Sequence, residues 1–193
     1  MRLLLVSAAI VVLDQISKLL VKGIPALNMA GLRPGEKIPV IKNLFDITLV
    51  ENPGIAFGIN FGSEFKLVIS IFTLIASAGL LFFFLKIKNK NFGLRLSIVL
   101  ILGGAAGNLI DRLFYGILYG YAPLCYGKVV DFFSIHFFNI YLFNTTLGNY
   151  IINVADLSVT AGMVCLLFAI RKQDKERETS DAVMGNLLVK GKE

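Results

Sequence analysis

Apolar residues in this chain gather into four long runs separated by polar segments. The runs are Leu3 to Leu20, Leu67 to Leu85, Leu96 to Ile110 and Ile151 to Ile170. A helix needs about 20 mostly apolar residues to cross the hydrocarbon core of a bilayer. The third run reaches this length only when Arg95 and Asp111 lie at the interface. The pattern therefore predicts four transmembrane helices, at about residues 3–21, 66–86, 95–112 and 150–170.

The first run has a second interpretation, because a cleaved signal peptide is also apolar. Such a peptide has an uninterrupted core of about 7–15 residues and then a cleavage site of small residues. Here Asp14, Gln15 and Lys18 interrupt the run, and no Ala-x-Ala follows closely. We therefore favour an uncleaved transmembrane helix.

The segments between the runs carry a different pattern, in which apolar and polar residues alternate. Residues 44–50 have this period of two, which is typical of a strand, and the stretch Lys128 to Phe133 is also strand-like. Asn52-Pro53-Gly54 predicts a turn, after which residues 55–59 resume an apolar run. Gly and Tyr are frequent from Gly116 to Gly127, which indicates a loop. We expect a small β-sheet at the membrane surface.

Composition agrees with a membrane location. Hydrophobic residues make up 56% and charged residues 17% of the 193 residues, and the mean hydropathy is +0.75. Soluble domains carry roughly 25% charged residues. These values exclude a soluble enzyme and a disordered chain. The net charge of +6 does not indicate a nucleic-acid partner, because the basic residues cluster at the ends of the apolar runs.

The basic residues also predict an orientation. The connection between the second and third runs holds Lys86, Lys88, Lys90 and Arg95 without an acidic residue, and residues 171–177 are rich in Lys and Arg. Cytoplasmic loops of membrane proteins carry such an excess. We therefore expect one membrane domain, residues 1–171, with a cytoplasmic tail, residues 172–193. Both termini then lie inside, and segments 22–65 and 113–149 face outward.

Few side chains are available for chemistry. A single histidine and two cysteines, Cys125 and Cys165, exclude a Ser/His/Asp triad, a zinc site and a disulfide framework. The two cysteines are not expected to meet. His136 stands among apolar residues, where a packed or interfacial role is the usual one. The candidates are therefore carboxylates, and we expect neither a metal nor a cofactor.

Two of the carboxylates have a basic neighbour in the sequence. Asp14 and Lys18 are four residues apart in the first run, the favourable order for a helical ion pair. Asp111 precedes Arg112 at the end of the third run, which suggests a salt bridge at the interface. Both acids then have a structural interpretation.

Asp131 and Asp156 lack such an explanation. Asp156 lies within the fourth run without a basic residue nearby, and Asp131 lies in the apolar stretch Val129 to Phe133. Burial raises the pKa of a carboxyl group, and two buried carboxyl groups that share a site hold one proton between them. Aspartic proteases use such a pair with a water molecule between its members.

A repeated motif places amides beside two of these acids. Asn108-x-x-Asp111 and Asn153-x-x-Asp156 each put an amide and a carboxylate on one helix face. The two runs are antiparallel, so both pairs are expected at a similar depth near the outer surface. Gly103 and Gly107 share a face where another helix can approach closely.

Five motifs occur in an order that resembles the bacterial lipoprotein signal peptidases, also called signal peptidase II. The motifs are Asp14 with Lys18, Asn52-Pro53-Gly54-Ile55-Ala56-Phe57, Gly107-Asn108-Leu109-Ile110-Asp111-Arg112, Val129-Val130-Asp131-Phe132 and Asn153-Val154-Ala155-Asp156. The resemblance covers about residues 10 to 170. The stretches between Arg112 and Asp131, and between Asp131 and Asp156, are longer than is usual in that family.

The resemblance implies a fold and an activity. The fold is an all-α membrane protein: a four-helix bundle with a small extracytoplasmic β-cradle and a short periplasmic helix. The activity is that of an aspartic endopeptidase of the bacterial inner membrane, which cuts diacylglyceryl-modified prolipoproteins before the lipidated cysteine. Membrane lipid would be its surroundings, and globomycin-type inhibitors would bind it.

The resemblance also implies roles for individual residues. Asp131 and Asp156 match the catalytic pair of the family. The supporting or substrate-binding positions are Asn52, Gly54, Asn108, Asp111, Arg112, Asn153, Asp14 and Lys18.

Two other functions remain as alternatives. A small proton-coupled transporter would use Asp14, Lys18 and Asp156 as a proton relay near the membrane midplane, but no duplicated half is visible. A purely structural membrane subunit would not need an unpaired Asp156 in an apolar helix.

Overall fold

A computed structural model describes residues 2–54, 63–142 and 145–190. Four of its helices are long and apolar enough to cross a membrane. They are α1 (Leu4–Lys22), α2 (Ser63–Lys86), α3 (Phe92–Ile110) and α5 (Val154–Lys190). The prediction of four spans is therefore confirmed, and the first run is a single helix through Asp14 and Lys18.

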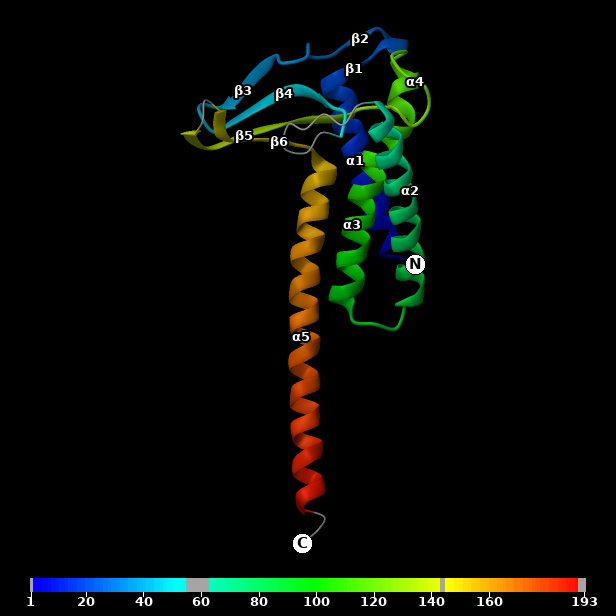
Figure 1. The fold of residues 1–193 in the computed structure, drawn as a ribbon, viewed down its shortest axis with the longest axis vertical. Coiled ribbons are helices and arrows are strands. Elements are labelled where there is room, and N and C mark those ends of the chain that lie inside the picture. Colours follow the sequence, from blue (N-terminus) through cyan, green and yellow to red (C-terminus); the bar gives the residue numbers. More distant parts are fainter. Residues whose placement is uncertain (1, 55–62, 143–144, 191–193) are drawn as a thin grey trace.

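Helix α3 is the centre of the bundle and contacts α1, α2 and α5 (Figure 1). Its glycines permit close approach on two sides. A Cβ atom on Gly103 would lie 3.1 Å from the Cα atom of Ser7 in α1, and one on Gly104 would lie 2.3 Å from the carbonyl oxygen of Ala155 in α5. Small residues in α3 thus bring three helices within reach of one set of polar side chains, as the spacing of Gly103 and Gly107 predicts for one neighbour.

The third span is longer than its apolar run. After Ile110 the chain continues as a π-helical turn, η2 (Asp111–Tyr115), and then as the short helix α4 (Gly116–Leu118). The backbone N–H groups of Gly127 and Cys125 donate hydrogen bonds to the carbonyl groups of Arg112 and Leu113, so the following loop folds back on this turn. The third span was predicted to end at residue 112, but the helical segment continues to Leu118. The loop predicted from Gly116 therefore begins only after Leu118.

A four-stranded antiparallel sheet lies across one end of the bundle (Figure 1). Its order is β3 (Lys37–Ile41), β4 (Phe45–Asn52), β5 (Val129–Leu142) and β6 (Thr145–Ile152). Strands β4 and β5 confirm the two predicted strands. The fourth span was predicted to begin at residue 150, but α5 begins at Val154 because the preceding residues pair with β5.

Smaller elements complete this end of the molecule. Strands β1 (Gly23–Ile24) and β2 (Met29–Ala30) form a two-stranded sheet on either side of the 3-10 turn η1 (Pro25–Leu27). The all-α expectation holds for the bundle alone, because the described residues also form six strands outside it. The apolar run predicted at residues 55–59 lies outside the described residues.

A small apolar core joins the sheet to the bundle. It contains Leu49 from β4, Tyr115 from η2, and Val130 and Phe132 from β5, all nearly inaccessible to solvent. The side chains of a strand alternate between its faces. Val130 and Phe132 therefore face this core, while Asp131 between them faces the other way.

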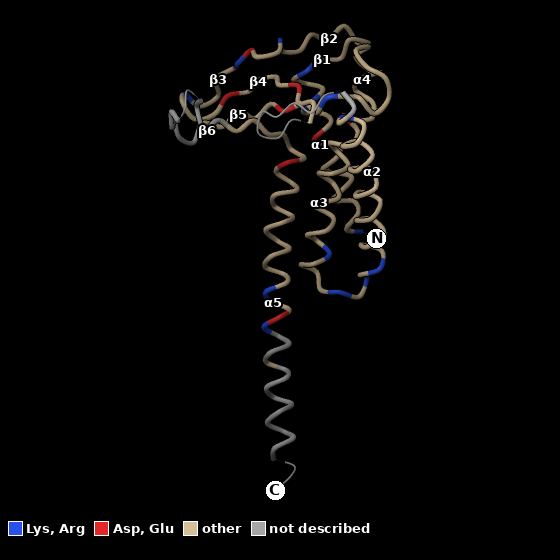
Figure 2. Tube along the Cα trace, viewed as in Figure 1, with Lys and Arg blue, Asp and Glu red and all other residues tan. Residues whose placement is uncertain are grey.

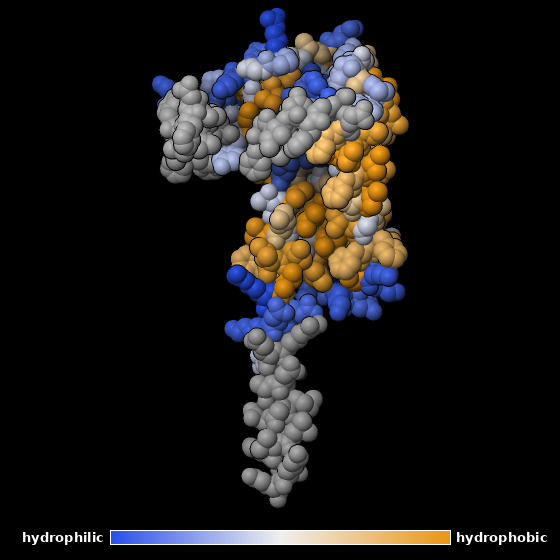
Figure 3. All heavy atoms as spheres, viewed as in Figure 1, coloured by the Kyte–Doolittle hydropathy of each residue, from blue (hydrophilic) through white to orange (hydrophobic). Residues whose placement is uncertain are grey.

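The surface of the bundle is suited to a bilayer. On the face that Figure 3 shows, an apolar belt covers the helices, with hydrophilic residues at both of its ends. Many large apolar side chains in this belt are exposed, among them Leu13, Phe72 and Phe168. Lys and Arg gather at the end remote from the sheet, on the α2–α3 connection and at the matching level of α5 (Figure 2).

Helix α5 extends past the rest of the bundle. It continues beyond the other helices as far as Lys190, and α1 begins toward the end of the bundle away from the sheet (Figure 1). The predicted tail, residues 172–193, is therefore an extension of the last span over most of its length.

Candidate active site

Asp131 and Asp156 are brought together by the start of helix α5. Asn153 directly precedes this helix and caps it: its side-chain oxygen accepts a hydrogen bond of 2.9 Å from the N–H of Asp156, and its own N–H donates one of 3.2 Å to Oδ2 of Asp156. This reciprocal arrangement is that of a capping box. The remaining amide group of Asn153 donates to Oδ1 of Asp131 at 2.6 Å. One asparagine thus contacts both carboxylates.

Two further amides complete the surroundings of the pair. Asn52, the last residue of β4, donates to Oδ2 of Asp131 at 3.1 Å. Asn108, near the end of α3, donates to Oδ1 of Asp156 at 2.9 Å. Among the described residues neither carboxylate belongs to an ion pair. Both acids are therefore held by neutral donors that do not fix their charge.

The environment of Asp131 favours a proton on this residue. Only 5% of its surface is exposed. Burial and the nearby charge of Asp156 raise the pKa of Asp131 from 3.8 to about 7, although hydrogen bonds from Asn52 and Asn153 act in the opposite direction. A carboxyl group with this pKa exchanges a proton near neutral pH, as a general acid or base must.

A glycine turn fixes the orientation of Asn52. The N–H of Gly54 donates to the side-chain oxygen of Asn52 at 2.9 Å, so the amide nitrogen of Asn52 points toward Asp131. Gly54 has φ +94°, a backbone conformation that residues with a side chain rarely adopt. The turn predicted at Asn52-Pro53-Gly54 therefore determines which end of the amide faces the carboxylate.

A second polar cluster lies deeper in the bundle around Lys18. Its ammonium group is 2.7 Å from Oδ2 of Asp14 and 2.7 Å from Oδ2 of Asp111, and none of these three side chains is exposed. The predicted pair of Asp14 and Lys18 is confirmed, with Asp111 as a third member. We call Asp14, Lys18 and Asp111 the lysine cluster.

The lysine cluster is linked to both candidate catalytic residues through the backbone. Oδ1 of Asp14 accepts a hydrogen bond from the N–H of Ala155 at 2.9 Å, and Oδ2 of Asp111 accepts one from the N–H of Val130 at 3.1 Å. Ala155 and Val130 are the residues directly before Asp156 and Asp131. The cluster therefore fixes the backbone at the point where each of these two acids leaves it.

Lys18 also orients one of the amides. Its ammonium group donates to Oδ1 of Asn108 at 2.9 Å, and Asn153 donates to the same oxygen at 3.1 Å. The amide nitrogen of Asn108 then faces Asp156. The two Asn-x-x-Asp motifs lie at a similar depth, as predicted, and they also contact each other through Asn108 and Asn153. Asp111 belongs to the lysine cluster instead.

The salt bridge predicted between Asp111 and Arg112 was wrong. Asp111 pairs with Lys18, while a guanidinium nitrogen of Arg112 donates to the carbonyl oxygen of Asn108 one turn earlier at 3.2 Å. Successive residues on a helix do not face each other, so this outcome follows from helix geometry. Arg112 still interacts electrostatically with Asp111, Asp131 and Asp156.

Sequence reasoning missed Gln15 as part of the lysine cluster's surroundings. Its amide nitrogen donates to Oδ1 of Asp111 at 2.8 Å and to the carbonyl oxygen of Gly107 at 3.1 Å, while its oxygen accepts from the hydroxyl of Tyr115 at 3.1 Å. The available signal was a third polar residue within an otherwise apolar run, beside Asp14.

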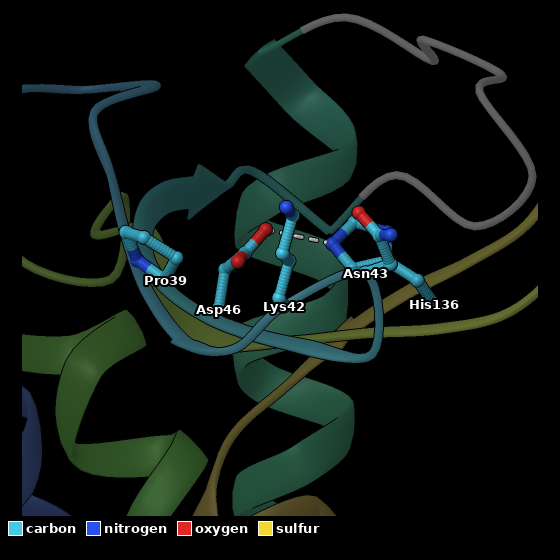
Figure 4. Close-up of a pocket in the computed structure, with 5 residues that line it drawn as sticks. All are labelled: Pro39, Lys42, Asn43, Asp46 and His136. Atoms are coloured by element: carbon cyan, nitrogen blue, oxygen red, sulfur yellow. Dashed lines mark hydrogen bonds and ion pairs between the residues drawn. The ribbon is translucent and has the colours of Figure 1, made fainter.

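His136 lies away from this site, at the opposite end of β4 from Asn52. It is half-buried against Asp46, with 2.8 Å between Nε2 and Oδ2, beside a cavity of about 290 Å³ lined by Pro39, Lys42, Asn43, Asp46 and His136 (Figure 4). The expectation of a packed role is consistent with this position. Cys125 and Cys165 are both free, as predicted.

The described residues contain no group of three or more His, Cys, Asp or Glu side chains that could hold a metal ion. The arrangement offers instead the buried carboxyl group of Asp131, which exchanges a proton near neutral pH, and the partly exposed carboxyl group of Asp156, with three amides around them.

Comparisons with known proteins identify the family of the chain. The family model described as "Signal peptidase (SPase) II" matches residues 6–172. A lipoprotein signal peptidase of Clostridium acetobutylicum is 36% identical over 146 residues, which cover 75% of this chain and 82% of the relative. One of Clostridium novyi is 33% identical over 165 residues, covering 86% and 94%.

Solved structures show the same fold. One described as a bacterial membrane enzyme superposes with a TM-score of 0.63 at 30% identity, covering 91% of this chain and 90% of the other. A second has a TM-score of 0.60 at 31% identity, covering 88% and 92%. With its four apolar helices and its matching length, the chain belongs to the signal peptidase II family, the aspartic peptidases that cleave signal peptides from bacterial lipoproteins.

Proposed function

We propose that Asp131 and Asp156 are the catalytic dyad of this peptidase. The observation that carries the proposal is the bridge through Asn153, whose side chain and backbone contact both carboxylates. Asp131 and Asp156 also take part in no ion pair among the described residues, unlike Asp111. A dyad must be free to exchange a proton, and an acid held by a lysine is not.

The environment supports a division of roles. The raised pKa of Asp131 makes it the member that carries the proton at rest, and Asp156 is then the carboxylate. Asp156 takes a proton from a water molecule as the water oxygen attacks the carbonyl carbon of the scissile bond. Asp131 donates its proton to the carbonyl oxygen, which gives a neutral tetrahedral intermediate with two hydroxyl groups.

The second half of the reaction returns the protons. When the C–N bond breaks, Asp156 gives its proton to the departing nitrogen, and Asp131 recovers its proton from the hydroxyl group that becomes the new carbonyl oxygen. The products are a carboxyl group and an amine, and the dyad is restored. General acid–base groups of this kind contribute about 10²- to 10⁴-fold each to the rate.

The substrate proposed for this site is a diacylglyceryl-modified prolipoprotein, cut before its lipidated cysteine. The dyad lies where the apolar belt meets the sheet, so the lipid and the signal helix can remain in the bilayer while the scissile bond reaches the carboxylates. Globomycin-type inhibitors would bind at the same pair of carboxylates. A carrier would instead place its acids near the midplane.

The orientation in the membrane belongs to the same proposal. Lys and Arg gather at the end away from the sheet (Figure 2), which supports cytoplasmic termini and an outward-facing dyad. Fused after Lys88, a reporter that works only in the cytoplasm is expected to be active, and one that works only outside the cytoplasm is expected to be inactive. Activity restricted to an extracytoplasmic reporter at this position would reverse the orientation.

The test of the dyad compares three substitutions in purified full-length protein with a lipid-modified prolipoprotein. Asp131→Asn and Asp156→Asn are expected to abolish the shortened product while the protein remains folded. Asp111→Asn is the matched control, since it neutralises a third nearby acid; some turnover per folded molecule should remain. Normal turnover in Asp131→Asn together with a folded, inactive Asp111→Asn would replace Asp131 by Asp111 in the dyad.

A further inference from the structure

Glu51 is held between two lysines beside the end of strand β4. Its carboxylate forms one ion pair with Lys22, the last residue of α1, and another of 2.9 Å with Lys128, just before β5. The side chain of Glu51 is 21% exposed and that of Lys22 is 5% exposed. We call Lys22, Glu51 and Lys128 the strand clamp, because the cluster ties α1 to the two strands that carry Asn52 and Asp131.

The strand clamp is fixed by its surroundings. The ammonium group of Lys22 lies 4.2 Å from the ring centre of Tyr119 and 5.2 Å from that of Tyr121, distances typical of cation–π contacts. The hydroxyl of Tyr119 donates to the carbonyl oxygen of Gly23, and that of Tyr121 accepts from the N–H of Lys128. Both aromatic partners are thus held in place by the backbone.

Glu51 remains a carboxylate in this cluster. Burial alone would raise the pKa of Glu51, but hydrogen bonds and charge interactions with Lys22 and Lys128 outweigh it, so that the pKa is lowered. An ion pair that is withdrawn from water is costly to break on one side only, because the other charge is left without a partner. The clamp is therefore a stiff connection.

This connection leads directly to the dyad. In the β4–β5 ladder Glu51 pairs with Val130 and Asn52 pairs with Val129, while the Asn52 amide donates to Asp131. Glu51 and Asn52 are neighbours on one strand, so their side chains point to opposite faces. Glu51 therefore holds the strand from one face while Asn52 contacts Asp131 from the other.

We propose that Glu51 is a positioning residue for peptide-bond cleavage, which fixes the end of β4 so that Asn52 keeps its hydrogen bond to Asp131. The proposal rests on the dyad proposed above. Glu51 contacts neither dyad carboxylate among the described contacts, so it acts through Asn52 and not on the substrate.

The decisive variant is Glu51→Gln, which keeps the shape of the side chain and removes its charge. A small misplacement of a group near the reacting atoms costs up to about 10²-fold in rate. We expect Glu51→Gln to lower kcat by about 10- to 100-fold and to change KM by less than about twofold. Glu51→Asp, which restores the charge, should recover most of the activity.

The matched control is Glu36→Gln. Glu36 is an exposed acid of the same outward segment. Its carboxylate accepts a hydrogen bond from the N–H of Arg33 and takes no part in the ion pairs of the strand clamp. Its kcat should equal that of the parent. An unchanged kcat in Glu51→Gln, like that of Glu36→Gln, would overturn the positioning role.

The pH profile separates positioning from a simple charge effect. Loss of the negative charge of Glu51 would by itself favour the carboxylate form of Asp131 and move the limb near pH 7 to lower pH. The hydrogen bond from Asn52 lowers the pKa of Asp131, so loss of this bond would move the limb near pH 7 to higher pH. We expect the upward shift; a downward shift with retained kcat would contradict the proposal.

Two further variants keep the test decisive. If Glu51→Gln does not fold, Lys128→Gln replaces it: Lys128 is 33% exposed, and its loss leaves the ion pair of Lys22 and Glu51 intact. Its kcat should fall by a smaller factor with the same upward shift, and parent values would overturn the role. Asp131→Asn identifies a different failure, because retained turnover there would disprove the dyad whatever Glu51→Gln does.

Discussion

The lysine cluster and the proposed dyad each contain two aspartates and are connected through the backbone, yet the partners of these aspartates differ. In the lysine cluster, Asp14 and Asp111 share the ammonium group of Lys18, and all three side chains are fully buried. In the dyad, Asp131 and Asp156 receive hydrogen bonds from Asn52, Asn108 and Asn153. The carboxylates of the first cluster are paired with a cation, and those of the second form no ion pair among the described residues.

This difference teaches how one bundle can hold both a scaffold and a reactive centre. A carboxylate paired with a buried lysine remains an anion, and removal of its partner is costly. A carboxyl group surrounded by amides keeps its position when it gains or loses a proton, because an amide can remain a neighbour to both forms. Lys18 pairs with Asp14 and Asp111 instead, and the carboxylates of these two residues accept hydrogen bonds from the backbone N–H groups directly before each dyad member.

The largest effect is expected at the dyad itself. Asp131→Asn and Asp156→Asn each remove a group that must transfer a proton, so turnover should fall by about 10²- to 10⁴-fold or more. Product formation from a lipid-modified prolipoprotein, measured over hours, reports the loss. Circular dichroism and elution as a single species are the controls. Near-normal turnover in either variant would show that the substituted acid does not transfer a proton in the reaction.

Substitution in the lysine cluster should lower the stability of the protein rather than the rate of cleavage. Lys18→Met removes the only lysine of the cluster and leaves Asp14 and Asp111 buried without it, which costs about 3–5 kcal/mol. We expect a low yield and a much lower melting temperature in detergent, before any question of rate arises. A control that replaces an exposed cation, Lys88→Met, should melt like the parent. If Lys18→Met were as stable as the parent but inactive, Lys18 would have a role in catalysis rather than in stability.

Much of this arrangement could be predicted from sequence, and the errors have a common cause. The spans, the strands at Phe45–Asn52 and Val129–Leu142, and the similar depth of the two Asn-x-x-Asp motifs follow from local periodicity. The partner of Asp111 does not, because Lys18 is distant in the sequence and Arg112 is adjacent. Only the close packing of α1 against α3 reveals the ion pair.

The boundaries of two spans were wrong for a related reason. Asp111 and Arg112 resemble the end of an apolar helix, but Lys18 neutralises Asp111 and the helix continues to Leu118. Ile151 and Ile152 resemble the start of a span, but they pair with β5. In both places a contact between distant segments decides the structure, and periodicity cannot report such contacts.

Asn52 tests how strongly the dyad depends on its amides. Asn52→Ala removes one hydrogen bond to Asp131 and the acceptor for the N–H of Gly54. We expect cleavage to fall by about 10- to 100-fold while the protein accumulates normally in the membrane. Asn52→Asp is the companion variant: it keeps the turn and places a second acid against Asp131, which should lower activity further. Full activity of Asn52→Ala would remove Asn52 from the site.

The smallest expected effect concerns stability and its dependence on pH. The pKa of Asp131 is about 7 in the folded protein and 3.8 as the reference value, so the folded state binds this proton more tightly than the unfolded state. The contribution of Asp131 to stability is therefore fully present below pH 4 and is lost as the pH rises to 7. One unit of pKa corresponds to about 1.4 kcal/mol, so the loss amounts to a few kcal/mol.

Asp131→Asn does not titrate, and its melting temperature in detergent should decline less than that of the parent between pH 5 and 8. The comparison of slopes cancels any constant cost of the amide. Asp111→Asn, which lies in the lysine cluster, should instead melt lower than the parent at every pH in this window. Parallel slopes for the parent and Asp131→Asn would mean that Asp131 stays charged in the folded protein, and the distinction between a fixed and a titratable cluster would fail.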